Sequence, residues 1–114
     1  MVRHPALPLT ETTYLILLSL IKPAHGYIIM KEVDRLSNNN VKIAAGTMYG
    51  ALDNLLKQGW IQTVASKDKR RKVYQVTQEG LKVIKAETER MHALLNLADE
   101  MMNEEELEDG RQNL

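Results

Sequence analysis

Cysteine is absent from this 114-residue chain, and long apolar runs are absent as well. Without cysteine, disulfide bridges and thiolate metal sites are excluded, and a reducing compartment, the cytoplasm, is the expected location. The longest apolar run covers residues 14–18, far short of the roughly 18 apolar residues that a membrane-spanning helix requires, so no membrane partner is expected. Residues 1–11 lack an apolar run before their prolines and a small-residue cleavage site, so we do not expect a signal peptide.

Residue combinations that support catalysis or metal binding are also missing. The three histidines, His4, His25 and His92, are far apart in the sequence, and none has an acidic partner at a metal-ligand spacing. His25, directly before Gly26, is better explained as a helix-capping or packing residue. No nucleophile motif or glycine-rich phosphate loop is present. We therefore expect neither an enzyme nor a metal or cofactor site.

The charge of the chain is balanced overall but divided along its length. Lys and Arg together number 15, as do Asp and Glu. Residues 1–76 carry 11 basic side chains against five acidic ones, whereas residues 77–114 carry four against ten. This division indicates a basic working surface and an acidic tail with a different role.

Apolar periodicity and capping signals predict two helices in the first third of the chain. Thr10 is expected to cap a buried helix that ends near residues 22–23; composition alone would also allow a strand, but the cap, the leucine content and the length favour a helix. A second helix is expected over about residues 26–36. Its expected apolar face comprises Tyr27, Met30, Val33 and Leu36.

A third helix and a β-hairpin are expected next. The helix begins either at Thr47, as its cap, or earlier at residues 44–45, and it ends at Gly59. Residues 60–66 and 72–77 alternate apolar and polar side chains, which is typical of two paired strands. Three helices followed by a hairpin are the order of a winged helix-turn-helix.

A long last helix is expected from its cap, Thr77, to about Met102. Residues spaced alternately by four and three positions form a coiled-coil seam along it. These are Thr77, Leu81, Ile84, Thr88, Met91, Leu95, Ala98 and Met102. Such a helix is about 38 Å long, and each large apolar seam residue left in water would cost about 1.5–3 kcal/mol. The seam therefore predicts a homodimer; the alternative is one helix that folds back on its own core.

The expected fold is thus mainly α (α+β), a winged helix-turn-helix followed by a long C-terminal dimerisation helix. We expect a flexible N-terminal arm over residues 1–9 and a DNA-binding domain over residues 10–76. The dimerisation helix covers residues 77–102, and a frayed acidic tail covers residues 103–114.

Positive charge is concentrated in the expected hairpin turn. Its basic residues are Lys67, Lys69, Arg70, Arg71 and Lys72. A charge run alone is more often a solvated turn, but one that follows a helix-turn-helix pattern fits a wing on a phosphate backbone or in a minor groove. On the third helix, the candidates for DNA contact point away from the apolar stripe. They are Thr47, Tyr49, Gly50, Asp53, Asn54 and Lys57.

The chemistry of these third-helix residues suggests individual roles. Tyr49 either contacts a phosphate or base edge or packs half-buried against the second helix. Thr47 either bonds a phosphate or caps the helix, and Asn54 can bond adenine. Gly50 allows the backbone to approach DNA closely. Asp53 either accepts a bond from a cytosine amino group or weakens binding by repelling phosphates.

Three segments of the sequence resemble the PadR family of bacterial transcriptional regulators. They are LTETTYLILLSLIKPAHGYIIMKEV, GTMYGALDNLLKQGWI and RRKVYQVTQEG. The resemblance covers about residues 9–102 and depends on the motifs HGY, GT-x-Y-x-x-L and RRK-x-Y-x-x-T-x-x-G. The short C-terminal part is similar to the compact subgroup, which has a single C-terminal dimerisation helix.

The resemblance implies a dimeric repressor that binds an inverted-repeat operator and controls its own gene or a neighbouring transport or stress gene. It implies that the third helix enters the major groove while Arg70, Arg71 and Lys72 hold the wing on the backbone. It also implies a small hydrophobic or aromatic ligand where the last helices cross, near Ile84, Thr88, Met91 and Leu95. Some drug-binding relatives have Trp where this chain has Met91, so an apolar, pliable pocket is expected here.

Two other functions are open at this point. One is a winged-helix adaptor that binds proteins without specific DNA binding and docks through its acidic tail. The other is a small-molecule sensor or enzyme that uses the seam pocket. Neutralising Arg70, Arg71 and Lys72 would abolish DNA binding by a repressor but leave partner binding by an adaptor intact.

Overall fold

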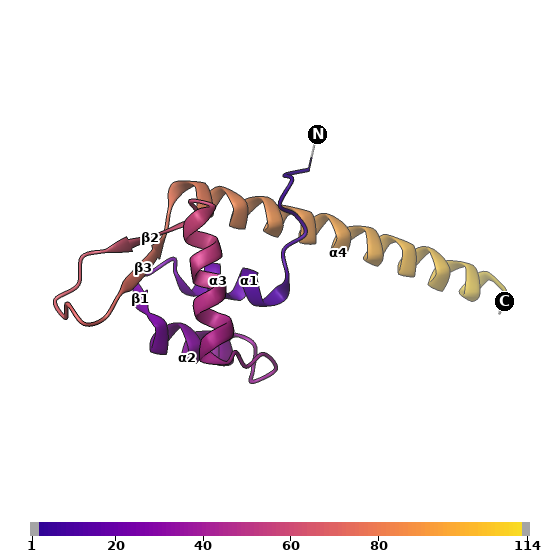
Figure 1. Ribbon diagram of the computed structural model, residues 1–114. Helices are drawn as coiled ribbons and strands as arrows, with labels where there is room; N and C mark the ends of the chain where they lie inside the picture. Colours follow the sequence, from indigo (N-terminus) through magenta and orange to yellow (C-terminus); the bar gives the residue numbers. More distant parts are fainter. Residues whose placement is uncertain (1–2, 113–114) are drawn as a thin grey trace.

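Four helices and a three-stranded antiparallel sheet make up residues 3–112, the part that the computed structural model describes, with side chains through Glu105. Figure 1 shows the body of the molecule and the long helix that extends from it. The elements are α1 (Glu11–Ser19), β1 (Ala24–His25), α2 (Gly26–Leu36), α3 (Ala45–Lys57), β2 (Ile61–Val64), β3 (Val73–Val76) and α4 (Gln78–Gln112). This is the winged helix-turn-helix with a long C-terminal helix that the sequence predicts.

Helix α1 begins where its cap predicts but ends earlier than expected. The side chain of Thr10 accepts a hydrogen bond from the Thr13 N–H at 3.1 Å, and the helix ends at Ser19 rather than near residues 22–23. Because Pro23 disfavours helical backbone before it, the chain leaves the helix and enters β1, a two-residue strand that the sequence analysis missed. A strand of two residues is too short to show alternation.

Helix α2 has the predicted bounds, but only part of its predicted apolar face, Val33 and Met30, packs on the core. Its buried residues are Gly26, Ile29 and Val33. Tyr27 and Leu36, expected on the buried face, are exposed. At the start of the helix, a Cβ on Gly26 would lie 2.6 Å from the Tyr49 hydroxyl oxygen. The helix therefore packs closely against α3 through its glycine.

Helix α3 takes the earlier of the two predicted starts. Ala44 is its N-cap residue, so Thr47 lies within the helix and does not cap it. At the other end Gly59 has the predicted left-handed conformation, with φ of 77°. The Trp60 N–H donates to the Leu55 carbonyl at 3.1 Å and the Gly59 N–H to the Leu56 carbonyl at 3.0 Å. These two bonds form a Schellman motif that ends the helix.

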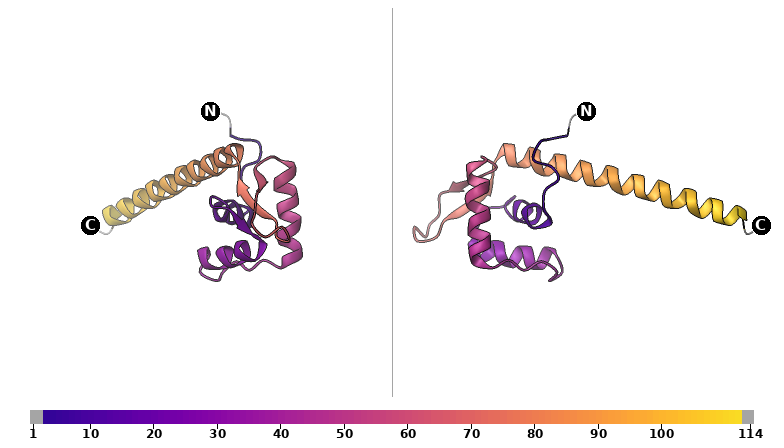
Figure 2. Two further views of the ribbon diagram at one scale, coloured as in Figure 1. Left: turned by 90° about the vertical axis from the view of Figure 1, so that its left-hand side faces the viewer. Right: turned by 45° about the vertical axis from the view of Figure 1, so that its right-hand side comes forward.

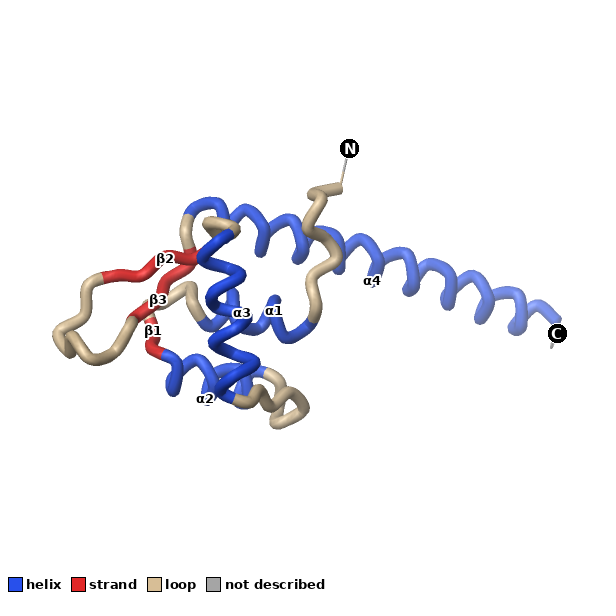
Figure 3. Tube along the Cα trace, in the orientation of Figure 1, coloured by secondary structure: helices blue, strands red, loops and turns tan. Residues whose placement is uncertain are grey.

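The sheet has the strand order β1-β3-β2, so the short strand β1 pairs with β3, on the side away from β2. The register pairs Ile61 with Val76 and Val64 with Val73, and Ala24 pairs with Tyr74. The loop of residues 65–72 extends well beyond the paired strands, as Figure 3 shows. We call β2, β3 and this loop the wing.

Helix α4 packs on the core only through its first turns. The Thr77 side chain caps it by accepting from the Gly80 N–H at 3.1 Å, and Val83, Ile84 and Glu87 are buried. Ile84, expected in the seam, belongs to the core of its own chain, because α4 lies against α1 and β3 here. From Met91 to Glu105 every side chain is exposed. The alternative, a helix that folds back on its own core, therefore holds only for the first turns of α4.

The helix continues to Gln112, ten residues beyond the expected end near Met102. Glu and Leu, which favour helix, are frequent after Met102, and no proline interrupts them. The expected acidic tail of residues 103–114 is therefore helical as far as Gln112. Its side chains beyond Glu105 lie outside the described residues. Within residues 3–112, no helix has the length and apolar character needed to cross a membrane.

Candidate nucleic-acid interface

Helix α3 divides into a buried face and an exposed face that carries the predicted contact residues. Met48, Leu52 and Leu55 are buried in the core. All six predicted contact residues are exposed: Thr47, Tyr49, Gly50, Asp53, Asn54 and Lys57. Thr47, Tyr49 and Gly50 lie in the N-terminal half of α3, and Tyr49 contacts the start of α2. Asn54 instead lines a hollow of about 310 Å³ beside the N-terminal arm, with Pro8 and Thr10.

The N-terminal arm is partly held against the body. The Leu9 N–H donates to the Glu87 carboxylate at 2.7 Å, and the His4 ring meets the edge of Trp60, with 6.3 Å between their centroids. Ala6, Leu7 and Leu9 pack against the core. From His4 onwards the arm therefore has defined contacts with the body.

The five basic residues of the wing are all exposed, in the loop between β2 and β3. Asp68 organises this loop: its side chain accepts from the Arg70 N–H at 3.0 Å and its carbonyl from the Arg71 N–H at 3.1 Å. Its carboxylate also lies 3.7 Å from the side-chain Nε of both arginines. Exposed pairs of this kind stabilise little, so the cations remain available to an anionic partner.

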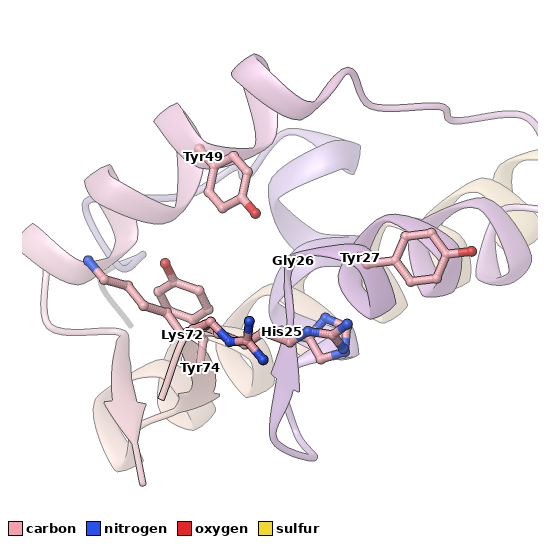
Figure 4. Close-up of a pocket in the computed structure, with 8 residues that line it drawn as sticks. His25, Gly26, Tyr27, Tyr49, Lys72 and Tyr74 are labelled. Carbon is pink, nitrogen blue, oxygen red and sulfur yellow. The ribbon is translucent and has the colours of Figure 1, made fainter. Parts of the chain in front are cut away.

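A cavity of about 710 Å³ lies between the wing, the start of α2 and α3 (Figure 4). We call it the wing cavity. Its lining residues are His25, Gly26, Tyr27, Tyr49, Arg70, Arg71, Lys72 and Tyr74. It brings together residues predicted separately on α3 and on the wing. Sequence reasoning missed the other four as site residues, although three of them form the HGY motif.

His25 orients one of the wing arginines at this cavity. The Arg71 Nη1 lies 3.2 Å from the His25 Nε2, and because a guanidinium only donates, the His25 Nε2 is the acceptor in this contact. The Tyr27 ring stacks on the His25 ring, with 6.5 Å between the two ring centroids. The Lys31 ammonium lies 4.9 Å from the centroid of Tyr27. The edge of the cavity is thus aromatic and positively charged.

Tyr74 on β3 is the most buried aromatic side chain of the cavity, with 4% of its surface exposed. Burial raises the pKa of its hydroxyl, and the nearby Tyr49 and Asp53 raise it further when they are charged. The hydroxyl therefore keeps its proton near neutral pH and can act as a hydrogen-bond donor.

A second surface of interest runs along α4. Its exposed large apolar residues are Leu81, Met91, Leu94, Leu95, Leu97, Met101 and Met102. Where α4 passes α1, an apolar hollow of about 250 Å³ is lined by Tyr14, Thr88, Met91, His92 and Leu95. The Thr88 hydroxyl donates to the Ile84 carbonyl at 2.8 Å, so the Tyr14 hydroxyl, 2.6 Å away, donates to Thr88. Three predicted seam residues, Thr88, Met91 and Leu95, therefore adjoin this hollow.

Comparisons with known proteins show which family model and which folds this chain matches. The sequence model of the family described as "Transcriptional regulator PadR-like family" matches residues 15–86. No curated protein sequence gives a significant match. Many solved structures share the fold.

Three of these structures illustrate the similarity. A transcriptional regulator from Clostridium thermocellum is 26% identical, with a TM-score of 0.65 over 79% of this chain and 87% of its own. A PadR family transcriptional regulator from Eggerthella lenta is 28% identical, with a TM-score of 0.64 over 79% and 80%. A PadR family regulator from Clostridium difficile, 23% identical with a TM-score of 0.66 over 80% and 97%, shares the fold.

Proposed function

The chain belongs to the PadR-like family of transcriptional regulators, and from this premise we propose that it is a dimeric, sequence-specific DNA-binding repressor. Its target is its own gene or a neighbouring transport or stress gene. One observation above all supports the proposal: the cationic wing and Tyr49, on the exposed face of α3, border the same cavity. In Figure 2 the wing and α4 project from the body in different directions, which leaves the wing free for DNA.

DNA binding would use α3 and the wing together. The exposed start of α3, with Thr47, Tyr49 and Gly50, would enter a major groove. The five wing cations would then lie along the neighbouring phosphates. Asn54 and Lys57, further along the helix, would contact DNA at the edge of the interface.

Dimerisation would use the exposed part of α4. Leu95, Leu97 and Met101 each expose more than half of their surface in the single chain, and apolar side chains gain free energy when a partner covers them. A second copy paired along this stripe would supply that cover. Two-fold pairing would direct two α3 helices at the two halves of an inverted repeat.

The apolar hollow beside Thr88 supports a ligand site in this dimer. A small hydrophobic or aromatic molecule would pack on Met91 and Leu95. The flexible methionine side chain would adapt to the shape of the ligand. Its binding would release the repressor from DNA. Calorimetry with aromatic cations should show weaker binding by Met91→Ala than by the parent protein, and equal binding would remove this hollow as the site.

The function is tested by selection of duplexes from a random pool, followed by gel-shift measurements on the enriched sequence and on the region upstream of the gene. We expect an inverted repeat, bound by a dimer, and lower expression of a reporter placed behind it. The triple variant Arg70→Gln, Arg71→Gln, Lys72→Gln should lose binding, whereas Lys82→Gln, Lys85→Gln should keep it. Failure to enrich any sequence, even at low salt, would contradict the proposal and favour the protein-binding adaptor.

A further inference from the structure

We propose that the wing cavity seats one phosphate of the DNA backbone, held by the hydroxyls of Tyr74 and Tyr49 and by the backbone N–H groups at the start of α2. This inference rests on the proposed function and deepens it. It assigns a binding role to Tyr74 and to the start of α2, which the sequence analysis did not include among the DNA contacts.

The Tyr74 hydroxyl is the first observation that points to a ligand. The side chain is almost fully buried, and it lines the cavity from β3. Figure 4 shows its hydroxyl directed towards Tyr49 across the opening. Among the hydrogen bonds of residues 3–112, none involves this hydroxyl. The ring is buried, but the hydroxyl is accessible at the cavity and makes no hydrogen bond to the described residues of the protein, so it is free to donate to an acceptor that enters the cavity.

The start of α2 is the second observation. His25, the N-cap residue, makes no side-chain hydrogen bond to the first turn. The N–H groups of this turn are therefore without a capping side chain, and the helix dipole adds partial positive charge there. A phosphate is a common ligand for such a helix end.

Gly26 leaves room for the Tyr49 side chain to lie against this helix end. The Tyr49 hydroxyl oxygen lies 2.6 Å from the point that a Cβ at residue 26 would occupy. A side chain there would displace Tyr49 and fill the floor of the cavity. With glycine, the Tyr49 hydroxyl and the helix N–H groups face the same small volume, from two different helices.

The charges around the cavity suit an anion. Arg71 is held at the edge by His25, and Arg70 and Lys72 complete the cationic side. Two carboxylates lie nearby: Asp68 is engaged in the wing turn with the two arginines, and Asp53 raises the pKa of Tyr74 from outside the cavity lining. Cations therefore outnumber acidic groups, and the proposed donors line the same cavity.

The location favours a phosphate of DNA over a free anion. The cavity lies between α3 and the wing, so a duplex bound to both passes its opening. A phosphate held there would contribute the same free energy on every sequence and would fix the register in which α3 meets the bases. The seat is thus a positioning device, separate from base recognition.

The inference is tested with the selected operator and a set of duplexes in which one phosphate at a time is replaced by an uncharged methylphosphonate. For the wild-type protein, replacement of the seated phosphate should weaken binding about tenfold. In Tyr74→Phe, which keeps the ring but loses the hydroxyl, affinity for the unmodified operator should fall by a similar factor. The methylphosphonate at the seat should then cost Tyr74→Phe much less than it costs wild type, whereas replacements at other contacted phosphates should cost both proteins equally.

Salt dependence separates the hydroxyl from the cation. Tyr74→Phe should leave the slope of log affinity against log salt unchanged, whereas Arg71→Met should reduce its magnitude by about 1 per subunit. Lys85→Met, on the exposed surface of α4, serves as the charge control and should change neither slope nor affinity. Tyr49→Phe gives the same test of coupling to the methylphosphonate if Tyr74→Phe does not fold.

Titration with inorganic phosphate identifies the alternative source of the anion. A shift of the Gly26 amide signal by phosphate, without coupling between Tyr74 and any methylphosphonate, would mean a free-anion site and would overturn the proposal. Absence of any coupling with an operator that still binds tightly would overturn it as well and leave the proposed function intact. Failure to obtain an operator would instead count against the function itself.

Discussion

Glu87 is a carboxylate with 1% of its surface exposed, in the part of α4 that packs on the body. It accepts from the Leu9 N–H and pairs with Arg90 on the next turn of the helix. The hydrogen bond from Arg90 is the main reason that the pKa of Glu87 lies below its ordinary value; burial opposes this, and the Leu9 N–H adds to the lowering. A single side chain thus ties the N-terminal arm to α4.

Glu87→Gln should lower the stability of the protein. A charged acceptor for the Leu9 N–H contributes about 1 kcal/mol more than a neutral one, so the free energy of unfolding should fall by at least that amount at neutral pH. Because the pKa of Glu87 is lowered in the folded state, its contribution is present above the ordinary value of 4.5 and is lost as the pH falls through the folded-state pKa. Urea unfolding of both proteins at several pH values checks this: the difference should be constant above pH 4.5 and shrink below it. A difference independent of pH would show that the charge is not responsible.

Two glycines that look alike in the sequence should respond in opposite ways to alanine. A Cβ at Gly80 would lie 2.1 Å from the Trp60 carbonyl oxygen, whereas a Cβ at Gly50 would meet nothing within 4 Å. Gly80→Ala should therefore destabilise the fold by about 1–3 kcal/mol, and Gly50→Ala should stabilise α3 by up to about 1 kcal/mol. Thermal unfolding measures both. If the backbone at Gly50 approaches DNA, as its place on α3 suggests, Gly50→Ala should also bind the operator more weakly despite its higher stability.

At the scale of elements, the sequence predicts the helices and the hairpin well because each has a local signal. The bounds of α2 follow from periodicity, and the end of α3 follows from Gly59. The contacts between elements have no such signal. Which residues of α2 are buried depends on the elements that pack against it, and β1 forms only because β3 is beside it.

The same distinction applies to the candidate sites. Residues of the wing loop and the exposed face of α3 could be selected from charge and from the apolar stripe of the helix. Tyr74 could not, because an alternating strand does not reveal that a hydroxyl lacks a partner. Ile84 fits a heptad pattern, but the pattern does not show how many turns of α4 the body already covers.

The exposed stripe of α4 makes a specific prediction about assembly. Leu95 is 57% exposed and lies beyond the part of α4 that contacts the body, so Leu95→Asp should leave the fold of a single chain intact. A charge there would oppose apolar pairing, and sedimentation at micromolar concentration should show a monomer in place of the wild-type dimer. Asn96→Asp adds the same charge on the face of α4 opposite the stripe and should remain dimeric. Equal sedimentation of wild type and Leu95→Asp would exclude this stripe as the interface.

At the scale of the whole molecule, the principal extents are 70 × 33 × 20 Å, and charge is distributed along the longest dimension. The basic half of the sequence forms the body and the wing, and the acidic half forms the extended helix. A duplex at the wing would thus meet cations, while most of α4 extends away from the body (Figure 1).

This distribution predicts a steep dependence of DNA binding on salt. With roughly 6–10 phosphate contacts in a dimer, affinity should fall by about 10³–10⁵ between 50 and 200 mM salt. Fluorescence anisotropy with a labelled operator across that range gives the slope. A flat dependence would mean that the wing cations do not contact the backbone.

Thr77 sits where three elements meet. Its hydroxyl donates to the Gly59 carbonyl at 2.6 Å and accepts from the Gly80 N–H, and its own N–H donates to the Trp60 carbonyl at 2.9 Å. These hydrogen bonds hold the end of α3 and the beginning of α4 in a fixed relative orientation. In a dimer joined through α4, a change of a few degrees in the angle between the two α4 helices would therefore turn each α3 with it. The separation of the two α3 helices would then change.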